Sequence, residues 1–413
     1  MSSSIGKRSS ALPPLISPEF HAGEDIAAKW LSVRQRTPFY WHDREGPGFW
    51  VVAKHADARY VLKNSSLFNS LRGNVMDTLL AGGDSASGLM LAVSDGQEHR
   101  LIRSYVLKII ENKISGRFSE DLHRTTDEIV QQAVEKDVCD FAKEVASQVP
   151  ISVVSDLLDV PENDRPTLQK LASAALTSHT ADAALAAGKV AQTGIIEYFS
   201  DLARSKSATA EGTFLHSLVT LSKEDRKLEL SELIFNCYSL LLGGYETARL
   251  SMTGSAKALA DNPSQWQLLR SGGVALDTAI DELLRWTSPA MHVGRTAAQA
   301  TELHGQRIHD GDIITVWIAS ANFDPEEFVS PQLLDLARAP NRHLSFGYGS
   351  HFCVGATLAR MEFRAFASSL LRYVEDIELV GAPRAVSSNF LRGYKQLYAR
   401  LHRRRDNFKS LVI

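Results

Sequence analysis

The sequence predicts a mainly α-helical protein with small β-sheets. Most of its 413 residues lie in runs where apolar side chains recur every three or four positions, and this spacing places them on one face of a helix. Shorter runs rich in aromatic and β-branched residues occur at residues 39–52, 291–318 and 377–401, which is typical of strands. A composition of 44% hydrophobic and 23% charged residues is that of a globular protein with a large core.

The composition also narrows the classes of partner and the expected location. A net charge of −3 does not favour nucleic-acid binding. The first twenty residues contain no apolar signal region, and no run of eighteen apolar residues follows, so we expect a cytoplasmic protein without a membrane span. We expect residues 1–20 to form a disordered tail and residues 21–413 a single domain, since no linker or repeat is evident.

In the N-terminal half, the patterns predict a helix at residues 24–36, a hairpin of residues 39–41 and 49–52, and a short helix at 57–63. Residues 70–97 form a long segment that is rich in glycine and serine and also carries apolar side chains. Long loops of this kind are usually functional, and we expect it to line an apolar pocket. Helical patterns continue at 98–110, 117–134, 141–158 with an interruption at Pro150, and 172–203.

A helix predicted at residues 231–262 is long enough to cross a whole domain. Gly243 and Gly244 lie in its middle, where a glycine costs about 1 kcal/mol relative to alanine. Thr247 follows and can hydrogen-bond to the preceding turn and bend the helix. Two explanations for the glycines stay open: close helix packing, or a gap that holds a small ligand and a water. Helices at 279–286 and 354–373 and strands at 291–296, 302–304, 313–318 and 377–401 complete the prediction.

One cysteine stands in a loop that presents its sulfur. Cys353 is preceded by Phe346, Gly347 and Gly349 and followed by Gly355, and a helix starting near residue 354 would point its N–H groups at the sulfur. A buried free cysteine is the alternative interpretation. Cys139 and Cys237 are too distant in sequence to complete a metal motif with it.

The pattern Phe-Gly-x-Gly-x-His-x-Cys-x-Gly, followed by Ala-Arg-Met-Glu at 359–362, resembles the haem-binding loop of the cytochrome P-450 family. Three further motifs stand in the order found in that family. Gly-Gly-Tyr-Glu-Thr at 243–247 is similar to its oxygen-binding motif, Glu282 and Arg285 match its Glu-x-x-Arg pair, and residues 321–325 resemble its Ala-Asn-Arg-Asp-Pro run. This sequence departs from the family at Gln97, Gly243 and Phe323, where proline, alanine and arginine are common.

The resemblance implies a cytochrome P-450 fold with haem b between the long helix and the loop of Cys353, whose thiolate is the axial iron ligand. It assigns catalytic roles to Thr247, which would hold a water chain, and Glu246, which would relay protons. Buried haem carboxylates require cationic partners or other donors. The implied cofactor contacts are His99, Arg103, Gly243, Gly244, Arg295, His343, Phe346, Gly347, Cys353 and Gly355, and the substrate-pocket candidates are Met76, Leu89, Leu240, Ala290, His292, Val293 and Leu391.

The activity that the resemblance implies is monooxygenation by O2 of a medium-sized apolar substrate, a polyketide, terpenoid, steroid or carrier-bound intermediate of secondary metabolism. Electrons from NAD(P)H would arrive through a ferredoxin reductase and a soluble ferredoxin, and we expect a monomer. A haem-binding gas sensor is one alternative, against which the retained Glu246 and Thr247 argue. A non-catalytic module that recruits partners is another, against which Cys353, Glu282 and Arg285 argue.

Overall fold

The structure, a computed structural model, describes residues 13–22, 26–176, 182–205, 210–223 and 226–405. The α-helices are α1 (Pro18–His21), α2 (Ile26–Arg36), α3 (His55–Lys63), α4 (Met76–Leu80), α5 (Gly96–Ile114), α6 (Phe118–Val134), α7 (Phe141–Glu144), α8 (Gln148–Leu157), α9 (Arg165–Ala175), α10 (Asp182–Arg204), α11 (Phe214–Ser222), α12 (Leu230–Asp261), α13 (Pro263–Arg270), α14 (Leu276–Thr287), α15 (Ile318–Ala321) and α16 (Ala356–Tyr373). Short 3₁₀ turns lie at η1 (Leu91–Val93), η2 (Glu162–Asp164) and η3 (Gly349–His351).

The strands form several small sheets. They are β1 (Phe39–His42), β2 (Phe49–Val52), β3 (Phe68–Asn69), β4 (Cys139–Asp140), β5 (Val293–Ala297), β6 (Thr301–Leu303), β7 (Gln306–Ile308), β8 (Ile313–Val316), β9 (Val374–Leu379), β10 (Arg384–Ala385), β11 (Tyr394–Gln396) and β12 (Tyr398–Arg403). The largest sheet has the order β1-β2-β8-β5-β3, and a three-stranded sheet has the order β4-β12-β9. The predicted class, mainly α with small β-sheets, is confirmed.

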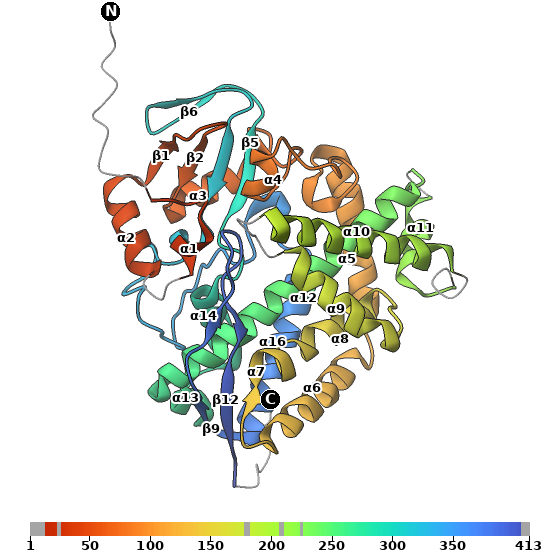
Figure 1. Cartoon of the computed structure of the whole chain (residues 1–413), viewed down its shortest axis with the longest axis vertical. Helices are drawn as coiled ribbons and strands as arrows, with labels where there is room; N and C mark the ends of the chain where they lie inside the picture. Colours follow the sequence, from red (N-terminus) through yellow and green to blue (C-terminus); the bar gives the residue numbers. More distant parts are fainter. Residues whose placement is uncertain (1–12, 23–25, 177–181, 206–209, 224–225, 406–413) are drawn as a thin grey trace, which may run out of the picture.

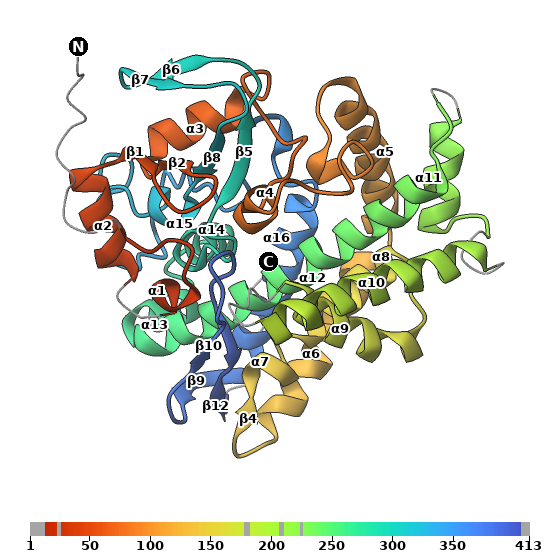
Figure 2. The same cartoon turned by 45° about the horizontal axis from the view of Figure 1, so that its top comes forward.

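The helices and the five-stranded sheet occupy different parts of the molecule (Figure 1). The sheet lies with α1 to α4 at one side, and the helices from α5 to α12 gather at the other. The largest cluster of buried apolar residues belongs to the helical part, and two smaller clusters include residues of the sheet strands. The long helix α12 crosses the helical part and passes close to α10 and α16 (Figure 2).

The long helix begins at a capping box, in which the side chains of Glu229 and Glu232 each accept a hydrogen bond from the backbone of the other residue. This arrangement satisfies N–H groups that have no partner within the helix. The helix therefore starts slightly before the predicted residue 231. It ends at Asp261, just before Asn262 and Pro263, and its 32 residues span about 48 Å.

The hairpin prediction is confirmed, because β1 and β2 pair antiparallel with Phe39 opposite Val52. The predicted interruption at Pro150 is wrong. The break between α7 and α8 falls at residues 145–147, and Pro150 is the third residue of α8. A proline is tolerated there because the N–H groups of a first helical turn have no partner in the helix.

The predicted N-terminal tail is also too long. Residues 1–12 lie outside the described residues, but residues 13–20 belong to the folded body. Leu15 has an exposed fraction of 0% and packs in one apolar cluster with Trp30 and Trp317. Among the described residues, no helix is long and apolar enough to cross a membrane.

Candidate active site between the cysteine loop and the long helix

The loop that carries Cys353 is held by its own backbone and by a close approach to α3. The N–H of Cys353 donates to the carbonyl of Phe346 at 2.8 Å, and the N–H of Gly347 donates to Leu344 at 2.8 Å. Gly349 has φ of +75°, and a Cβ there would lie 2.5 Å from the carbonyl oxygen of Leu62. Glycine is therefore required at this position, because another residue would combine an unfavourable φ with a steric clash.

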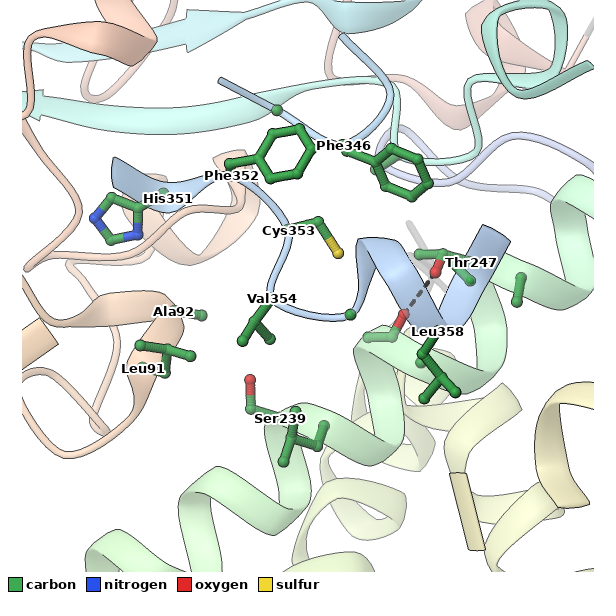
Figure 3. A pocket seen from close by; sticks show the side chains of 18 of the residues that line it. Leu91, Ala92, Ser239, Thr247, Phe346, His351, Phe352, Cys353, Val354 and Leu358 are labelled. Carbon is green, nitrogen blue, oxygen red and sulfur yellow. Dashed lines mark hydrogen bonds between the residues drawn. The ribbon is translucent and has the colours of Figure 1, made fainter. Parts of the chain in front are cut away.

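The thiol of Cys353 experiences opposing influences. Cys353 is an exposed free cysteine, but the protein atoms packed around its sulfur desolvate the thiolate and raise the pKa of the thiol above its usual value. The backbone N–H of Gly355 and the charges of Arg103 and Arg360 lower this pKa. The predicted helix begins at Ala356, so its first turn lies beside the sulfur as expected. Figure 3 shows the sulfur pointing into a cavity, with Thr247 on the wall that α12 forms. A metal bound at this sulfur would deprotonate the thiol.

The opposite wall of the cavity is the middle of α12. A Cβ added to Gly243 would meet nothing within 4 Å, so this position opens onto free space. At Gly244 an added Cβ would lie 3.3 Å from Val154 Cγ2, so the second glycine serves close packing of α12 against α8. The hydroxyl of Thr247 donates to the carbonyl of Gly243 at 2.5 Å (Figure 3). Close packing thus accounts for Gly244, while Gly243 leaves the free space that a small ligand would need.

The cavity between these walls has a volume of about 360 Å³ and a mainly apolar lining. Its size is within the usual range for small-molecule sites. The predicted residues that line it are His99, Arg103, Leu240, Gly243, Gly244, Thr247, Ala290, His292, Val293, Arg295, Phe346, Gly347, Cys353 and Gly355. The structure therefore brings together the cysteine loop, α12, the start of α5 and the start of β5.

Cationic and imidazole side chains meet at one side of the cavity. His99 is buried, and burial together with neighbouring His351 and Arg103 lowers its pKa to about 4, so the ring is neutral at pH 7. Burial lowers the pKa of Arg295 to about 10, which leaves it charged. His99 Nε2 and Arg295 Nε are buried without a hydrogen-bond partner among the described residues. Such groups are costly unless a ligand pairs with them.

These observations fit a haem. A sulfur faces the cavity from one wall, a glycine-lined helix forms the other, and unpartnered donors lie where carboxylates could pair with them. Cys353 would ligate the iron, and His99, Arg103 and Arg295 would hold the carboxylates. When bound, a cysteine-ligated haem supplies O2 binding and cleavage of the O–O bond.

The segment before the cysteine loop is fixed by a buried ionic network. Arg285 donates through Nε to Glu282 at 2.7 Å, and both side chains have an exposed fraction of 0%. Arg338 donates to the same carboxylate at 3.0 Å, as does the amide of Asn341 at 3.0 Å. Arg285 Nη1 also donates to the carbonyls of Asn322 and Pro331. The predicted pair is buried and ties α14 to residues 322–341.

Phe323 replaces the arginine that is common in the family, and its ring lies under a charge from the same network. The guanidinium carbon of Arg285 is 5.0 Å from the centre of the Phe323 ring. This distance is within the range of a cation–π contact. Phe323 is therefore accommodated without an additional buried charge.

The prediction that His343 contacts the cofactor is not supported by its position. His343 does not line the cavity, and its Nε2 lies 3.4 Å from Asp281. His351 lines the cavity instead, packs against His99 with tilted rings whose centres are 4.1 Å apart, and pairs with Asp95 at 2.9 Å. The signal was present in the sequence, because His351 is the histidine of the cysteine motif itself. We place His351, rather than His343, with the residues that would hold haem.

Glu246 does not line the cavity either. It is buried, with an exposed fraction of 3%, and accepts hydrogen bonds from Arg249 Nε at 2.9 Å and from Ser173 at 3.3 Å. Arg249 also donates through Nη2 to the second carboxylate oxygen. Glu246 is thus engaged in an ion pair and is not among the lining residues, so its role as a proton relay remains a prediction.

Three of the seven predicted pocket residues lie elsewhere. Met76 is buried in the cluster of Trp30 and Trp317, and Leu391 packs with Leu250. Leu89 is partly buried and is not among the lining residues. Their places are taken by sequence neighbours, since Leu91, Ala92, Asn74 and Phe390 line the cavity. The predicted segments therefore reach the cavity, but through neighbouring residues and not through these three side chains.

His292 lines the cavity as predicted, but its ring is already engaged. Its Nε2 accepts a hydrogen bond from the N–H of Met76 at 3.0 Å, and the ring packs between Trp317 and Phe390. Burial lowers its pKa to about 3. It therefore fixes the start of α4 beside β5.

Sequence reasoning missed a further residue on the cysteine side. Glu362 of α16 lines the cavity, and its Oε2 is buried without a partner among the described residues. Burial raises the pKa of this carboxyl well above its usual value. The residue stands in the quoted motif, but periodicity alone gave no reason to separate it from an ordinary surface carboxylate.

Comparisons with known proteins agree with the site. The sequence profile of the family "Cytochrome P450" matches residues 274–377. The chain is 39% identical over 389 residues to cytochrome P450 NovI of Streptomyces niveus, covering 94% of this chain and 96% of the relative. It is 29% identical over 376 residues to steroid C26-monooxygenase of Mycolicibacterium smegmatis, covering 88% and 87%.

The fold is also similar to solved structures. The crystal structure of P450 OxyD, which is involved in the biosynthesis of vancomycin-type antibiotics, matches with a TM-score of 0.84 and 29% identity. The match covers 95% of this chain and 100% of the other.

Proposed function

The chain belongs to the cytochrome P450 family of monooxygenases, and we propose that its substrate is a medium-sized apolar intermediate of secondary metabolism. The reaction would insert one atom of O2 into a C–H or C=C bond of the substrate. The second oxygen atom would leave as water after taking up two electrons and two protons.

The observation that carries the proposal is the cavity itself. The sulfur of Cys353 and the hydroxyl of Thr247 both face it, and apolar side chains form most of the remaining lining apart from the cationic and imidazole groups at one side (Figure 3). Apolar walls of this kind include Leu91, Leu240, Ala290 and Val293. Binding an apolar molecule there would release water from these surfaces, which favours binding.

Thr247 is placed to handle a proton at this cavity. Its hydroxyl hydrogen is donated to Gly243, so its oxygen is left to accept a hydrogen bond from a water or a bound molecule. Glu246 would have to leave its ion pair with Arg249 to pass a proton toward that oxygen. We therefore propose that Thr247 holds the last water of the relay and that Glu246 supplies it only after this exchange of partners.

The substrate class is supported by the apolar lining and by two relatives. One similar protein is named for steroid oxidation and another for a role in antibiotic biosynthesis. Polyketides, terpenoids and steroids share the required size and apolar character. A substrate attached to a carrier protein presents the same apolar group on a tether.

We also propose that electrons come from NAD(P)H through a ferredoxin reductase and a soluble ferredoxin. An acidic ferredoxin would dock where basic side chains surround the cysteine side. Arg100 of α5 is exposed, and Arg360 and Arg364 are partly exposed but already pair with Asp281 and Asp277. The two aspartates reduce the net positive charge of this surface, so docking should depend on Arg100 in particular.

Titration of the haem-loaded protein with a panel of steroids, terpenoids and polyketides tests the substrate class. We expect at least one apolar compound to change the haem spin state, because it would displace water near the iron. An Ala290→Phe variant, which adds bulk to the apolar wall, should weaken binding of the largest compounds first. A second set of titrations uses those panel compounds that have a carboxylic acid, joined as thioesters to a carrier protein. No spin-state change with any free or carrier-bound apolar compound would contradict the proposal.

A further inference from the structure

The cavity wall formed by Leu91 and Ala92 belongs to a segment with few apolar anchors. In residues 84–95, Ala86, Met90 and Val93 form a small cluster that is separate from the main core. Phe235 and Tyr238 of α12 pack against that cluster. Leu91 belongs to the main apolar core. Asp95, the last residue of the segment, accepts a hydrogen bond from the N–H of Ser70. Local segments with so few buried contacts open more readily than a domain core.

Asn236 of α12 connects directly to the backbone of this segment. Its Oδ1 accepts a hydrogen bond from the N–H of Leu91 at 2.9 Å, and its Nδ2 donates to the carbonyl of Leu89 at 3.0 Å. Nδ2 also donates to the carbonyl of Glu232, one turn earlier in α12, at 2.8 Å. The side-chain amide therefore pairs with the segment as the backbone of a neighbouring strand would.

The hydrogen bond between Asn236 and Leu91 lies in a buried position beside the cavity. Asn236 has an exposed fraction of 1% and lines the cavity, and Leu91 has an exposed fraction of 8%. If the amide were removed, the buried N–H of Leu91 would lose its partner, which costs more than losing an exposed hydrogen bond. The adjacent side chains that face the cavity would then lose their fixed position.

A second polar contact holds the same end of α12. Arg226 donates to Glu98 at the start of α5 at 2.8 Å and to Glu232 at 2.9 Å. Glu232 is the residue whose carbonyl accepts from Asn236. The first turns of α12, the start of α5 and the segment of residues 84–95 are thus joined through adjacent hydrogen bonds.

We propose that Asn236 is a positioning residue that fixes the wall formed by Leu91 and Ala92 and thereby determines which substrates fit. The proposal rests on the proposed function, since it takes this cavity as the substrate site. Asn236 does not contact the reacting atoms. It acts through Leu89 and Leu91, and its loss should affect large ligands more than small ones.

Hydrogen exchange and ligand binding of the haem-loaded protein test this role. In Asn236→Ala, the peptide covering residues 84–95 should exchange about tenfold faster, because the amide of Leu91 loses its partner. The rest of α12 should exchange as in the wild type. Asn262→Ala is the matched control, since Asn262 donates to Ala258 at the other end of the same helix at 2.8 Å and does not contact the segment. It should leave exchange of residues 84–95 unchanged.

Two probes with the same iron-binding group separate the wall from the rest of the site. Imidazole is too small to contact the wall formed by Leu91 and Ala92, whereas 1-(triphenylmethyl)imidazole should contact it. We expect Asn236→Ala to weaken the triphenylmethyl compound by about tenfold and imidazole by less than twofold. Asn236→Asp keeps the acceptor for Leu91 and loses the donor to Leu89. Its affinity for the triphenylmethyl compound should therefore lie between those of the wild type and Asn236→Ala, and it replaces the alanine variant if that variant does not fold.

Each part of the account has its own contradicting result. Unchanged exchange of residues 84–95 in both Asn236 variants, or equal weakening of both probes, would overturn the positioning role. A wild type that binds the two probes equally would instead contradict the apolar substrate cavity, while faster exchange in the variant would still support the contact of Asn236 with the segment.

Discussion

The two sides of the cavity are held in different ways. On the cysteine side, backbone hydrogen bonds fix the loop, the side chain of Asn322 accepts from Leu344 at 2.7 Å, and a buried ionic network lies behind it. On the opposite side, residues 84–95 pack through a separate cluster of three buried residues and through Leu91, and they are held by hydrogen bonds of Asn236 and Asp95. The comparison suggests that the metal-ligand side is built for a fixed geometry, whereas the substrate side can vary with fewer consequences for the fold.

Removal of Glu282 should have the largest effect on stability. Glu282→Ala leaves Arg285 and Arg338 buried without their carboxylate, and breaking a buried pair in this way costs about 3–5 kcal/mol. The free energy of unfolding, measured with urea, should fall by that amount, and less haem should be retained. The control is Arg364→Ala, whose exposed pair with Asp277 should contribute less than about 1 kcal/mol. An equal decrease in the free energy of unfolding in the two variants would contradict the claim that a buried ionic network fixes the cysteine side.

Thr247→Ala should separate activity from stability. The variant loses one hydrogen bond to Gly243 at a partly exposed position, so unfolding should change by about 1 kcal/mol or less. Product formation should fall by about 100-fold, the size expected when a proton-transfer group is lost, while O2 consumption continues. The ratio of product formed to O2 consumed, measured with a substrate found in the titration, checks this. A ratio equal to that of the wild type would show that Thr247 is not part of the relay.

Acid should lower the free energy of unfolding through two buried histidines that pack on Trp317. His21 and His292 both pack on Trp317, and burial lowers their pKa values to about 4 and about 3. The unfolded chain takes up their protons near pH 6.5 and the folded chain does not, so stability is present above pH 6.5 and is lost as the pH falls toward 4. For His21 alone the loss from pH 7 to pH 5 should be about 2 kcal/mol.

The variant His21→Gln keeps a donor for the carbonyl of Leu15 and removes the titrating group. Urea unfolding at pH 7 and pH 5 should therefore show a smaller pH dependence in the variant, by about 2 kcal/mol. The same pH dependence in both proteins would mean that His21 is not held neutral by burial.

Only a small effect on global stability is expected at Met90. Met90 belongs to the three-residue cluster and retains an exposed fraction of 7%, so Met90→Ala should reduce the free energy of unfolding by about 1 kcal/mol, below the range for a main core. Hydrogen exchange of residues 84–95 should nevertheless increase. A loss as large as that of Glu282→Ala would show that the segment unfolds together with the core.

The sequence was most informative where function depends on neighbouring residues in the chain. The cysteine loop and the two glycines of α12 could be placed because glycine spacing and a cysteine before a helix reflect local backbone needs. The directions of Met76, Leu89 and Leu391 could not be predicted, because they depend on which distant elements pack against their segments. The choice between His343 and His351 could not be predicted for the same reason, since only the fold brings α5 and Asp95 beside His351. The partner of Glu246 was close in sequence, but an (i, i+3) pair does not reveal whether it is buried.

The central claim is that Cys353 ligates a haem iron in the cavity opposite Thr247. The carbon monoxide difference spectrum of the reduced haem-loaded protein tests it most directly. We expect a thiolate-type band in the wild type and its disappearance in Cys353→Ser. A histidine-type spectrum in the wild type would contradict the account.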